Sequence, residues 1–161
     1  MTTKVLFVCT ANLCRSPMAE GVFRTLVERA GMADAFEISS AGTAEGFVGR
    51  PPMPDAIEVA ASRGYDISGH LSRQMGGDDI AHFDYPLAMD ATHLVAMRWL
   101  APRALAGKPK LFLSFGPMLG ITDVADPIGG PREGFVRALG VIEAGCKGLL
   151  ARLAPTVKTA I

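Results

Sequence analysis

The sequence has no excess of charge of either sign. Lysine and arginine together number 16, as do aspartate and glutamate, so the formal net charge of the 161 residues is zero. Proteins that attract nucleic acid or an anionic membrane surface through a broad electrostatic field carry a clear basic excess. We therefore expect no nucleic-acid partner, and any affinity for anions has to arise at a local site.

Long apolar runs are also missing. No stretch is long enough to cross a bilayer, and the start of the chain, Met1–Lys4, leads into a predicted strand without the features of a signal peptide. We therefore expect a cytoplasmic protein with no membrane partner. The length suits one domain, residues 1–161, that buries its own hydrophobic core.

Cysteine is scarce. Three cysteines cannot form a complete disulfide framework, and in a reducing compartment they are interpreted as thiols with individual roles. Cysteines and histidines elsewhere in the chain show no metal-ligand spacing, so we expect no metal site and no cofactor. Cys146 lies on the apolar stripe of a predicted helix and is expected in the core. His82 and His93 have no supporting context and are assigned no role.

The most informative stretch of the sequence combines a strand, a tight loop and a helix start. Val5–Val8 are apolar and predict a short strand buried on both faces. The strand ends at Cys9, and Arg15 follows six positions later. Ser16 stands where a helix N-cap is expected, and Pro17 suits the first helical turn. This order is typical of an anion-binding loop.

The rest of the chain predicts an α/β fold. An amphipathic helix ending near Gly31 and a second strand at residues 36–40 complete a βαβ unit with parallel strands. The further predicted elements are a helix from residue 55 to Gly64, a short helical turn within 67–79, a strand at 85–89, a helix capped by Asp90, a strand at 110–115 and a long helix with its apolar stripe at Phe135–Leu153. The predicted architecture is a single domain with a four-stranded parallel sheet and helices on both faces, doubly wound in a flavodoxin-like or Rossmann-like manner. A ligand site is expected at the carboxyl ends of the strands.

The loop from Cys9 to Arg15 has the elements of a phosphate site. Five intervening residues can curl the backbone around a tetrahedral anion so that successive amide hydrogens point inward. The N-terminus of the following helix adds positive potential, and the Arg15 guanidinium can hold two phosphate oxygens. In this field a thiolate is favoured over a thiol, which makes Cys9 a candidate nucleophile. Taken alone, Cys9 is better explained as a small buried hydrophobe at a strand end, and it is the spacing to Arg15 at a strand-to-helix turn, with Ser16 next to Arg15, that favours the nucleophile.

The segment VCTANLCRSPMAE, residues 8–20, resembles the phosphate-binding loop of the low-molecular-weight protein tyrosine phosphatases. Four further segments stand in the order expected for that family: Ser39–Thr43, Gly69–Gln74, Leu87–Asp90 and Asp126-Pro127. The resemblance therefore covers nearly the whole chain. It implies a metal-independent phosphatase that hydrolyses phosphotyrosine or other aryl phosphate monoesters through a phosphocysteine intermediate, with a phosphorylated protein or a small aryl phosphate as its substrate.

The resemblance also implies a role for each matching residue. Cys9 would attack phosphorus while Arg15 binds the phosphoryl oxygens. Asp126 would protonate the leaving phenolate and then activate water. Ser16 would donate its hydroxyl hydrogen to the Cys9 sulfur; its rival role is that of a plain N-cap. The other predicted phosphate- and substrate-binding residues are Thr10, Ala11, Asn12, Leu13, Cys14 and Phe47.

Asn12 matches the family residue that holds the loop in a left-handed conformation, which asparagine tolerates better than most residues. Ser40 and His70 match the partners of that asparagine. Cys14 lies five residues after Cys9, and in the family such a pair can form a reversible disulfide that protects the nucleophile from overoxidation. A thiol packed beneath the loop is an equal alternative.

Three departures from the family pattern concern the substrate. Ala11 stands where the family usually has glycine and would crowd the backbone if that position required a positive φ. The segments that usually carry aromatic residues of the pocket wall contain only Phe47 and, after Asp126-Pro127, Ile128 and two glycines. Each missing aromatic contact removes about 1 kcal/mol of stacking with a phosphotyrosine ring. Leu13, being apolar, suits an aryl group.

Two other functions compete with the phosphatase. A thiol-dependent arsenate reductase needs a pair of resolving cysteines some seventy to eighty residues after the nucleophile, and no cysteine lies between Asp78 and Asp90. A cysteine phosphocarrier or phosphate-binding module would use the same loop without hydrolysis. Such a carrier needs no general acid, so Asp126-Pro127 favours the enzyme.

Overall fold

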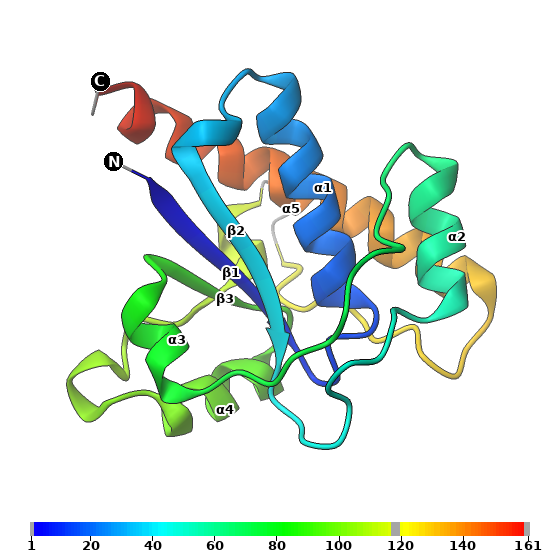
Figure 1. Ribbon diagram of the computed structural model, residues 1–161, viewed down its shortest axis with the longest axis horizontal. Coiled ribbons are helices and arrows are strands. Elements are labelled where there is room, and N and C mark those ends of the chain that lie inside the picture. Colours follow the sequence, from blue (N-terminus) through cyan, green and yellow to red (C-terminus); the bar gives the residue numbers. More distant parts are fainter. Residues whose placement is uncertain (1, 117–119, 160–161) are drawn as a thin grey trace.

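Four parallel strands form the centre of the molecule. The structure, a computed structural model, describes residues 2–116 and 120–159. The strands are β1 (Thr3–Cys9), β2 (Phe36–Gly42), β3 (Tyr85–Ala88) and β4 (Lys110–Leu111), in the order β2-β1-β3-β4 (Figure 1). All neighbouring strands are parallel, and Pro86 lies near the start of β3, opposite Leu6 of β1.

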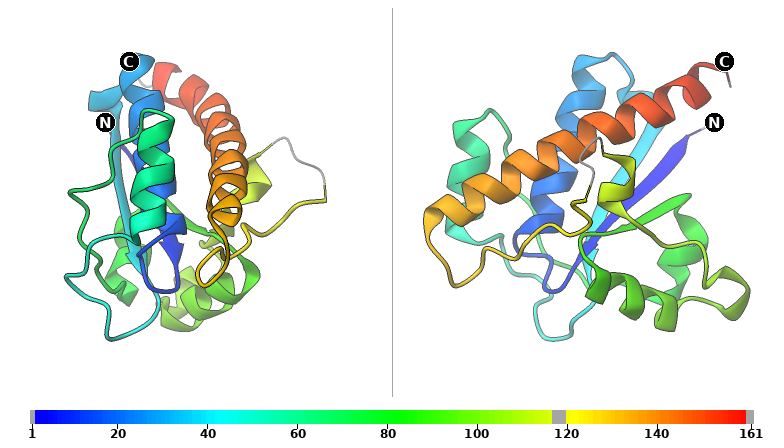
Figure 2. Two further views of the ribbon diagram at one scale, coloured as in Figure 1. Left: turned by 90° about the vertical axis from the view of Figure 1, so that its right-hand side faces the viewer. Right: turned by 180° about the vertical axis from the view of Figure 1, so that it is seen from behind.

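Helices cover both faces of this sheet (Figures 1 and 2). The helices α1 (Arg15–Arg29), α2 (Pro54–Ser62) and α5 (Arg132–Thr159) lie on one face, and α3 (Gly77–His82) and α4 (Ala91–Leu100) lie on the other. Alternate residues of β1 serve the two layers: Val5 and Phe7 pack with α1 and α5, whereas Leu6 and Val8 pack with α3 and α4. The predicted doubly wound α/β fold is therefore confirmed.

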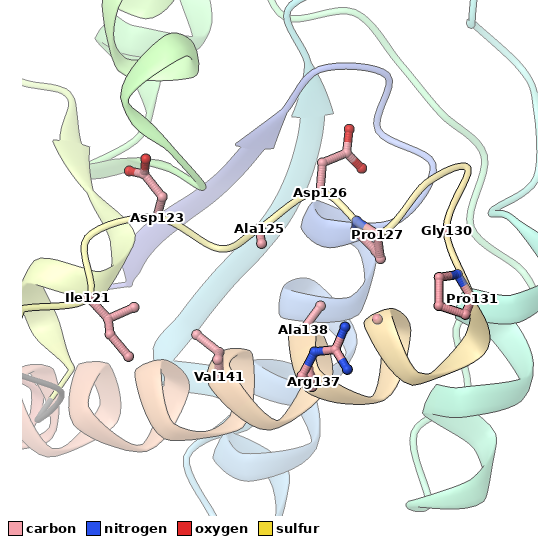
Figure 3. A pocket seen from close by; sticks show the side chains of 11 residues that line it. Ile121, Asp123, Ala125, Asp126, Pro127, Gly130, Pro131, Arg137, Ala138 and Val141 are labelled. Atoms are coloured by element: carbon pink, nitrogen blue, oxygen red, sulfur yellow. The ribbon is translucent and has the colours of Figure 1, made fainter.

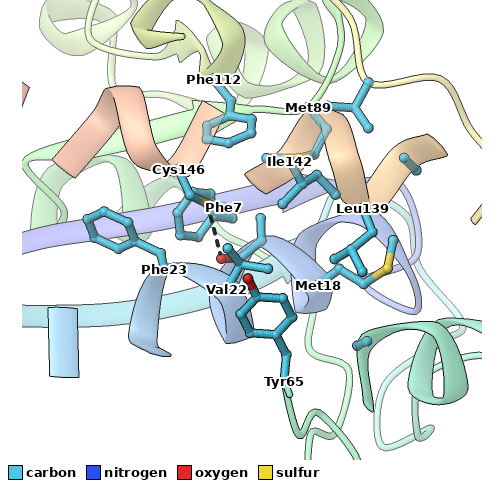
Figure 4. Packing of buried hydrophobic residues seen from close by; sticks show 14 of the residues in the cluster. Phe7, Met18, Val22, Phe23, Tyr65, Met89, Phe112, Leu139, Ile142 and Cys146 are labelled. Carbon is cyan, nitrogen blue, oxygen red and sulfur yellow. Dashed lines mark hydrogen bonds between the residues drawn. The ribbon is translucent and has the colours of Figure 1, made fainter. Parts of the chain in front are cut away.

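Aromatic rings dominate the core between the sheet and α5 (Figure 4). The Phe7 ring makes edge-to-face contacts with Phe23, at 5.9 Å between centroids, and with Phe112, at 5.5 Å. Cys146 is fully buried in α5, with its Sγ 3.6 Å from the Ala19 carbonyl oxygen, so its expected place in the core is confirmed. Gly145 allows the close approach of α5, because a Cβ there would lie 2.5 Å from the Phe112 ring.

The predicted strand at residues 110–115 is wrong beyond its first two residues. Only Lys110–Leu111 pair with β3, and Phe112–Phe115 form a 3₁₀ helix. A strand directs successive side chains to opposite faces of the sheet. Phe112 and Leu113 are instead both buried in the same cluster beneath α5, which requires the chain to turn between them.

The loops that follow β1, β2 and β3 meet at the carboxyl edge of the sheet. The backbone N–H of Thr43 donates to the Cys9 carbonyl at 2.9 Å, and that of Met89 donates to the Val8 carbonyl at 3.0 Å. The loop that follows β2 also contacts the loop that follows β1 near their far ends, where the backbone N–H of Met53 donates to the Leu13 carbonyl at 2.8 Å. Residues far apart in sequence are thus fixed around the loop that starts at Cys9. Within the described ranges, no helix has both the length and the hydropathy needed to cross a membrane.

Candidate active site

The loop from Cys9 to Ser16 lies at the edge of the sheet and is buried except at Thr10, which is exposed, and Ala11, which is half-buried. Cys9 ends β1 and is 3% exposed, and Arg15 begins α1 and is also 3% exposed. The N-terminus of α1, with its unpaired backbone N–H groups, therefore faces the same space as the Cys9 sulfur. Asn12 has a φ of 60°, the sole positive φ of a non-glycine residue in the described part of the chain.

Ser16 does not cap α1, contrary to one of its two predicted roles. The N-cap position is occupied by Cys14, which makes no side-chain capping bond, and Ser16 lies inside the first turn. Its hydroxyl oxygen lies 2.9 Å from the Cys9 sulfur and accepts a hydrogen bond from Asn12 Nδ2 at 2.8 Å. When Cys9 is a thiolate, its sulfur at 2.9 Å is the nearer of two acceptors for the hydroxyl hydrogen, the other being the Ala41 carbonyl oxygen at 3.5 Å.

Both ends of the Asn12 side chain hold the loop in place. Its amide nitrogen donates to Ser16 Oγ and, at 3.0 Å, to Ser40 Oγ, while its amide oxygen accepts from His70 Nε2 and from the backbone N–H of Arg73, each at 3.0 Å. Asn12 is completely buried. Four hydrogen bonds thus offset the conformational cost of its left-handed backbone.

Glu20 of α1 extends this network, although sequence analysis assigned it no role. Ser40 Oγ donates to Glu20 Oε1 at 2.6 Å, and the same oxygen lies 3.8 Å from His70 Nδ1. Burial lowers the pKa of His70, while the Glu20 carboxylate acts in the opposite direction. The predicted partners Ser40 and His70 therefore both contact Asn12 and are themselves connected through one carboxylate.

Ala11 is accommodated without strain, because the positive φ of the loop falls on Asn12 and not on the preceding residue. The glycine that the loop requires lies outside it, at Gly42, where the end of β2 approaches the loop backbone closely. A Cβ on Gly42 would lie 2.6 Å from the Thr10 carbonyl oxygen and 3.0 Å from the Ala11 carbonyl carbon. Gly42 therefore allows the loop backbone to rest directly on β2.

The guanidinium of Arg15 is held from two sides. Nη1 donates to Asp90 Oδ2 and to the Val124 carbonyl oxygen, each at 2.8 Å, and Nη2 lies 3.8 Å from Asp126 Oδ2. Burial alone would raise the pKa of Asp90, but hydrogen bonds from Thr92 and Arg15 outweigh it and lower that pKa to about 2. Asp90 is therefore ionised at neutral pH and keeps Arg15 oriented.

A pocket of about 360 Å³ opens over this loop, and Cys9 is among the residues that line it. The lining also includes Ile128 of the predicted pocket wall and two residues that were not predicted, Arg50 and Met53. The predicted catalytic and binding residues that line the pocket are Cys9, Thr10, Ala11, Leu13, Cys14, Arg15, Phe47 and Asp126. Asn12 is not among the lining residues, because its side chain is hydrogen-bonded to Ser16, Ser40, His70 and Arg73. The Arg50 guanidinium carbon stands 5.4 Å from the centre of the Phe47 ring, which places a cation at the pocket mouth.

Asp126 reaches the pocket from the opposite wall. Its side chain is 51% exposed, and one carboxylate oxygen accepts a hydrogen bond from the backbone N–H of Ile128 at 3.0 Å. Figure 3 shows Asp126 pointing away from α5, whereas Arg137 belongs to that helix on the other side of the segment. A second pocket of about 370 Å³ lies between this segment and α5.

Cys14 is packed beneath the loop. It is 1% exposed, and burial raises its pKa, with the neighbouring Cys9 acting in the same direction. All three cysteines are free thiols. No group of three metal-ligating side chains gathers anywhere in residues 2–116 and 120–159.

Two further contacts of the loop were not predicted from the sequence, that of Asp90 with Arg15 and that of His93 with Thr10. His93 Nε2 lies 2.8 Å from Thr10 Oγ1, and the ring is 2% exposed. The sequence contains a signal for Asp90 and His93. Residues that follow a strand at the carboxyl edge of a parallel sheet lie close to the ligand site. Asp90 follows β3, and the third residue of the helix it caps faces the same way.

The model of the family "Low molecular weight phosphotyrosine protein phosphatase" matches residues 4–159. The chain belongs to this family. As a low-molecular-weight protein tyrosine phosphatase, it is an enzyme, and neither the arsenate reductase nor the phosphocarrier alternative receives support.

Named relatives and solved structures support the same family assignment. A low molecular weight protein-tyrosine-phosphatase of Streptomyces coelicolor is 43% identical over 161 residues, covering 98% of each chain. The phosphatase YfkJ of Bacillus subtilis is 35% identical, covering 92% of this chain and 94% of its own. A crystal structure of the Entamoeba histolytica protein tyrosine phosphatase, with Hepes in its active site, superposes with a TM-score of 0.91 at 30% identity, covering 96% of this chain and 99% of that one. The family and the fold that the resemblance implied are thus confirmed.

Proposed function

We propose that this phosphatase hydrolyses phosphotyrosine in phosphorylated proteins, with Cys9 as nucleophile, Arg15 as phosphoryl-binding residue and Asp126 as general acid. The observation that carries the proposal is the position of Cys9, which lines the pocket and has its sulfur 2.9 Å from the Ser16 hydroxyl oxygen. Arg15 and Asp126 line the same pocket, with 3.8 Å between Nη2 and Oδ2. A phosphoryl group bound in this pocket has a nucleophile, a cation and an acid beside it.

In the first half-reaction the Cys9 thiolate forms a bond to phosphorus as the bond to the tyrosine oxygen breaks. Asp126 gives its proton to that oxygen, so that tyrosine leaves as a neutral phenol. Arg15 and the backbone N–H groups of the loop stabilise the charge on the three remaining phosphoryl oxygens. Since Asp90 and Val124 already hold one edge of the guanidinium, little reorganisation is needed.

In the second half-reaction water attacks the phosphocysteine. Asp126, now a carboxylate, takes a proton from that water, the sulfur–phosphorus bond breaks, and inorganic phosphate is released. The departing electron pair returns to the Cys9 sulfur, where the Ser16 hydroxyl hydrogen stabilises it. Because Asn12 donates to the Ser16 oxygen, that hydrogen has the sulfur as its nearest acceptor.

An aryl substrate fits the composition of the pocket. Leu13, Phe47, Met53 and Ile128 supply apolar surface around the loop. The Wzb protein of Vibrio vulnificus, 31% identical with a TM-score of 0.82, has been solved in complex with benzylphosphonate, an aryl compound with the charge of a phosphate monoester. We extend this substrate class to the present chain and place its activity in the cytoplasm, on phosphorylated proteins.

Two substitutions test the mechanism. Cys9→Ser should abolish turnover of p-nitrophenyl phosphate, because an alcohol is far less nucleophilic than a thiolate, and substantial residual turnover would contradict the assignment. Asp126→Asn should reduce kcat more for phenyl phosphate than for p-nitrophenyl phosphate, because a good leaving group needs no proton. Equal losses on both substrates would remove Asp126 from the role of acid. Asp34→Asn, in the exposed 3₁₀ helix Ala33–Ala35 that precedes β2, is the matched control carboxylate and should leave both rates unchanged.

A further inference from the structure

His93 is buried against the phosphate loop although it is too far along the chain to be recognised from the loop motif. It occupies the third position of α4, and Asp90 caps that helix by accepting from the backbone N–H groups of Thr92 and His93. The His93 ring in turn contacts the backbone of Asp90, with 3.2 Å between its Nδ1 and the Asp90 backbone nitrogen. Its other nitrogen, Nε2, is 2.8 Å from Thr10 Oγ1 and 3.5 Å from Arg15 Nη2.

The fixed backbone donor decides which ring nitrogen carries the proton. The Asp90 backbone N–H points at His93 Nδ1 with hydrogen-bond geometry at 3.2 Å, whereas the Arg15 guanidinium, which can only donate, reaches Nε2 at 3.5 Å, the limit of a hydrogen bond. The shorter contact makes Nδ1 the acceptor. The Asp90 carboxylate Oδ1 is also 3.2 Å from Nδ1, but without hydrogen-bond geometry, and it forms an ion pair with the ring only when the ring is protonated. In a neutral ring whose Nδ1 accepts, Nε2 carries the hydrogen and donates it to the Thr10 hydroxyl oxygen.

This assignment has a consequence for Thr10. A hydroxyl has one hydrogen to donate, and when its oxygen accepts from His93 that hydrogen must go elsewhere. Among the residues that the structure describes, Thr10 Oγ1 has no other hydrogen-bond partner. Thr10 is exposed and lines the pocket that contains Cys9 and Arg15. A phosphoryl oxygen bound in that pocket is the acceptor within its reach.

We propose that His93 is a positioning residue that holds the Thr10 side chain so that its hydroxyl donates a hydrogen bond to a phosphoryl oxygen of the substrate. This inference rests on the function proposed above, in which the phosphoryl group occupies the loop. It adds one side-chain donor to the backbone N–H groups and Arg15, and it explains why a histidine is buried at the start of α4. Thr10 touches the substrate, and His93 acts through Thr10.

The surroundings keep the ring neutral. Burial lowers the pKa of His93 to about 4, and Arg15, from α1, acts in the same direction. Three carboxylates oppose this effect: Asp90 on the cap of α4, and Asp126 and Asp123 on the segment that precedes α5. A neutral ring at pH 7 avoids a second cation beside Arg15 and leaves Nδ1 free to accept.

A matched set of substitutions tests the proposal. Thr10→Val removes the hydroxyl at nearly constant volume, and His93→Leu removes the donor to it. Each should reduce kcat/KM for p-nitrophenyl phosphate about tenfold and weaken the binding of inorganic phosphate, since one hydrogen bond to a charged group is lost. The double variant should lose no more than either single variant, because both act through one contact. His93→Gln, whose amide can replace Nε2–H, should recover most of the loss.

Two readouts separate this proposal from a structural role and from the function it rests on. The ring ¹⁵N shifts of His93 should show a neutral imidazole protonated at Nε2, and a ring protonated at Nδ1 would overturn the proposal. Additive losses in the double variant would also overturn it. Phosphate binding is measured without turnover, so a failure of the Cys9 mechanism leaves this test intact. His82→Gln is the control, because His82 is half-exposed and pairs with Glu37 on the surface at 2.6 Å.

Discussion

The floor and the rim of the pocket are built in opposite ways. We define the floor as Asn12, Arg15, Ser16 and Ser40, which are at most 3% exposed and are hydrogen-bonded to one another or to groups from other elements. The rim consists of Phe47, Arg50 and Ile128, which lie on loops and are half-buried or exposed. Moving a floor residue disturbs several buried hydrogen bonds, whereas changing a rim residue alters a surface that meets only the substrate.

This difference separates chemistry from substrate choice. Buried polar groups lose about 1–3 kcal/mol when a partner is removed, so the floor tolerates little variation. Loops at the surface vary at small cost and carry specificity. Two of the three departures of this chain from the family pattern fall on the rim, at residues 44–47 and 128–130, and the third, Ala11, is accommodated without a positive φ. The residues assigned to the reaction are present. We therefore expect floor variants to change kcat and rim variants to change KM.

The strongest test of this division compares two arginines of the same pocket. Arg15→Lys should lower kcat about 10²- to 10³-fold, because an ammonium cannot hold Asp90, Val124 and two phosphoryl oxygens together. Arg50→Lys should leave kcat unchanged and shift KM less than about threefold, because its charge at the mouth is retained. Steady-state kinetics with p-nitrophenyl phosphate gives both values, and comparable losses in kcat would remove the distinction.

A second test asks whether the floor depends on the backbone conformation of Asn12 or on its side chain. Asn12→Gly permits the φ of 60° but removes the four side-chain hydrogen bonds. Asn12→Ala also removes these hydrogen bonds, and in addition it strains the backbone at this φ. Both should reduce kcat about tenfold to 10²-fold, with alanine the more destabilised in thermal unfolding because of its added backbone strain. Full activity of Asn12→Gly would show that the side chain only supports the conformation.

Gly42→Ala tests the contact between the floor and β2. The added methyl group would lie 2.6 Å from the Thr10 carbonyl and should displace the loop, with a loss of about 1–3 kcal/mol in the free energy of unfolding and a reduced kcat. Gly69→Ala is a matched control, since a Cβ there meets nothing within 4 Å. Denaturant unfolding of the two variants checks this, and equal stabilities would show that the loop can move away from β2 freely.

The buried titratable groups of the site also predict a pH dependence. The pKa of His93 is lowered from 6.5 to about 4, so between these values the unfolded chain binds a proton that the folded protein excludes. The contribution of His93 to stability is therefore present above pH 6.5 and is lost as the pH falls toward 4. Between pH 7 and pH 4.5, the free energy of unfolding should fall more in the wild type than in His93→Gln. An identical fall in both proteins would contradict the lowered pKa.

The smallest effect is expected at the rim. Ile128→Tyr adds one aromatic wall and should lower KM for phosphotyrosine peptides about threefold to fivefold, since one stacking contact contributes about 1 kcal/mol. Its effect on kcat should be negligible, and Ile128→Val serves as a control for the change of side chain. A gain in kcat would mean that the rim also participates in the chemistry.

Much of the fold could be predicted from local pattern. Buried strands such as Val5–Val8 and the cap at Asp90 are encoded within a few residues, and the parallel sheet follows from their alternation with helices. The 3₁₀ helix at Phe112–Phe115 could not be predicted, because its apolar residues match a strand equally well. Their direction is decided by α5, which lies above them and leaves room for them at two glycines, Gly145 and Gly148.

The candidate site divides in the same way. Spacing places Cys9 and Arg15 on one loop, and that loop is short enough for the sequence to determine its shape. The function of Ser16 was open, since a hydroxyl at that position can cap a helix or reach a sulfur. The tertiary structure places Ser16 inside the first turn of α1, with its oxygen 2.9 Å from the Cys9 sulfur and accepting from Asn12 Nδ2 at 2.8 Å.

The sequence by itself determined β1, β2 and β3 and the position of the loop that carries Cys9, the proposed nucleophile, because these depend on residues close together in the chain. The tertiary structure alone decided which distant groups complete the site. Asp90, His93 and Glu20 reach the loop through contacts that span 75 residues between Arg15 and Asp90, 83 between Thr10 and His93, and 20 between Glu20 and Ser40. No local pattern specifies such pairs, because they exist only where the carboxyl ends of parallel strands bring separate loops together.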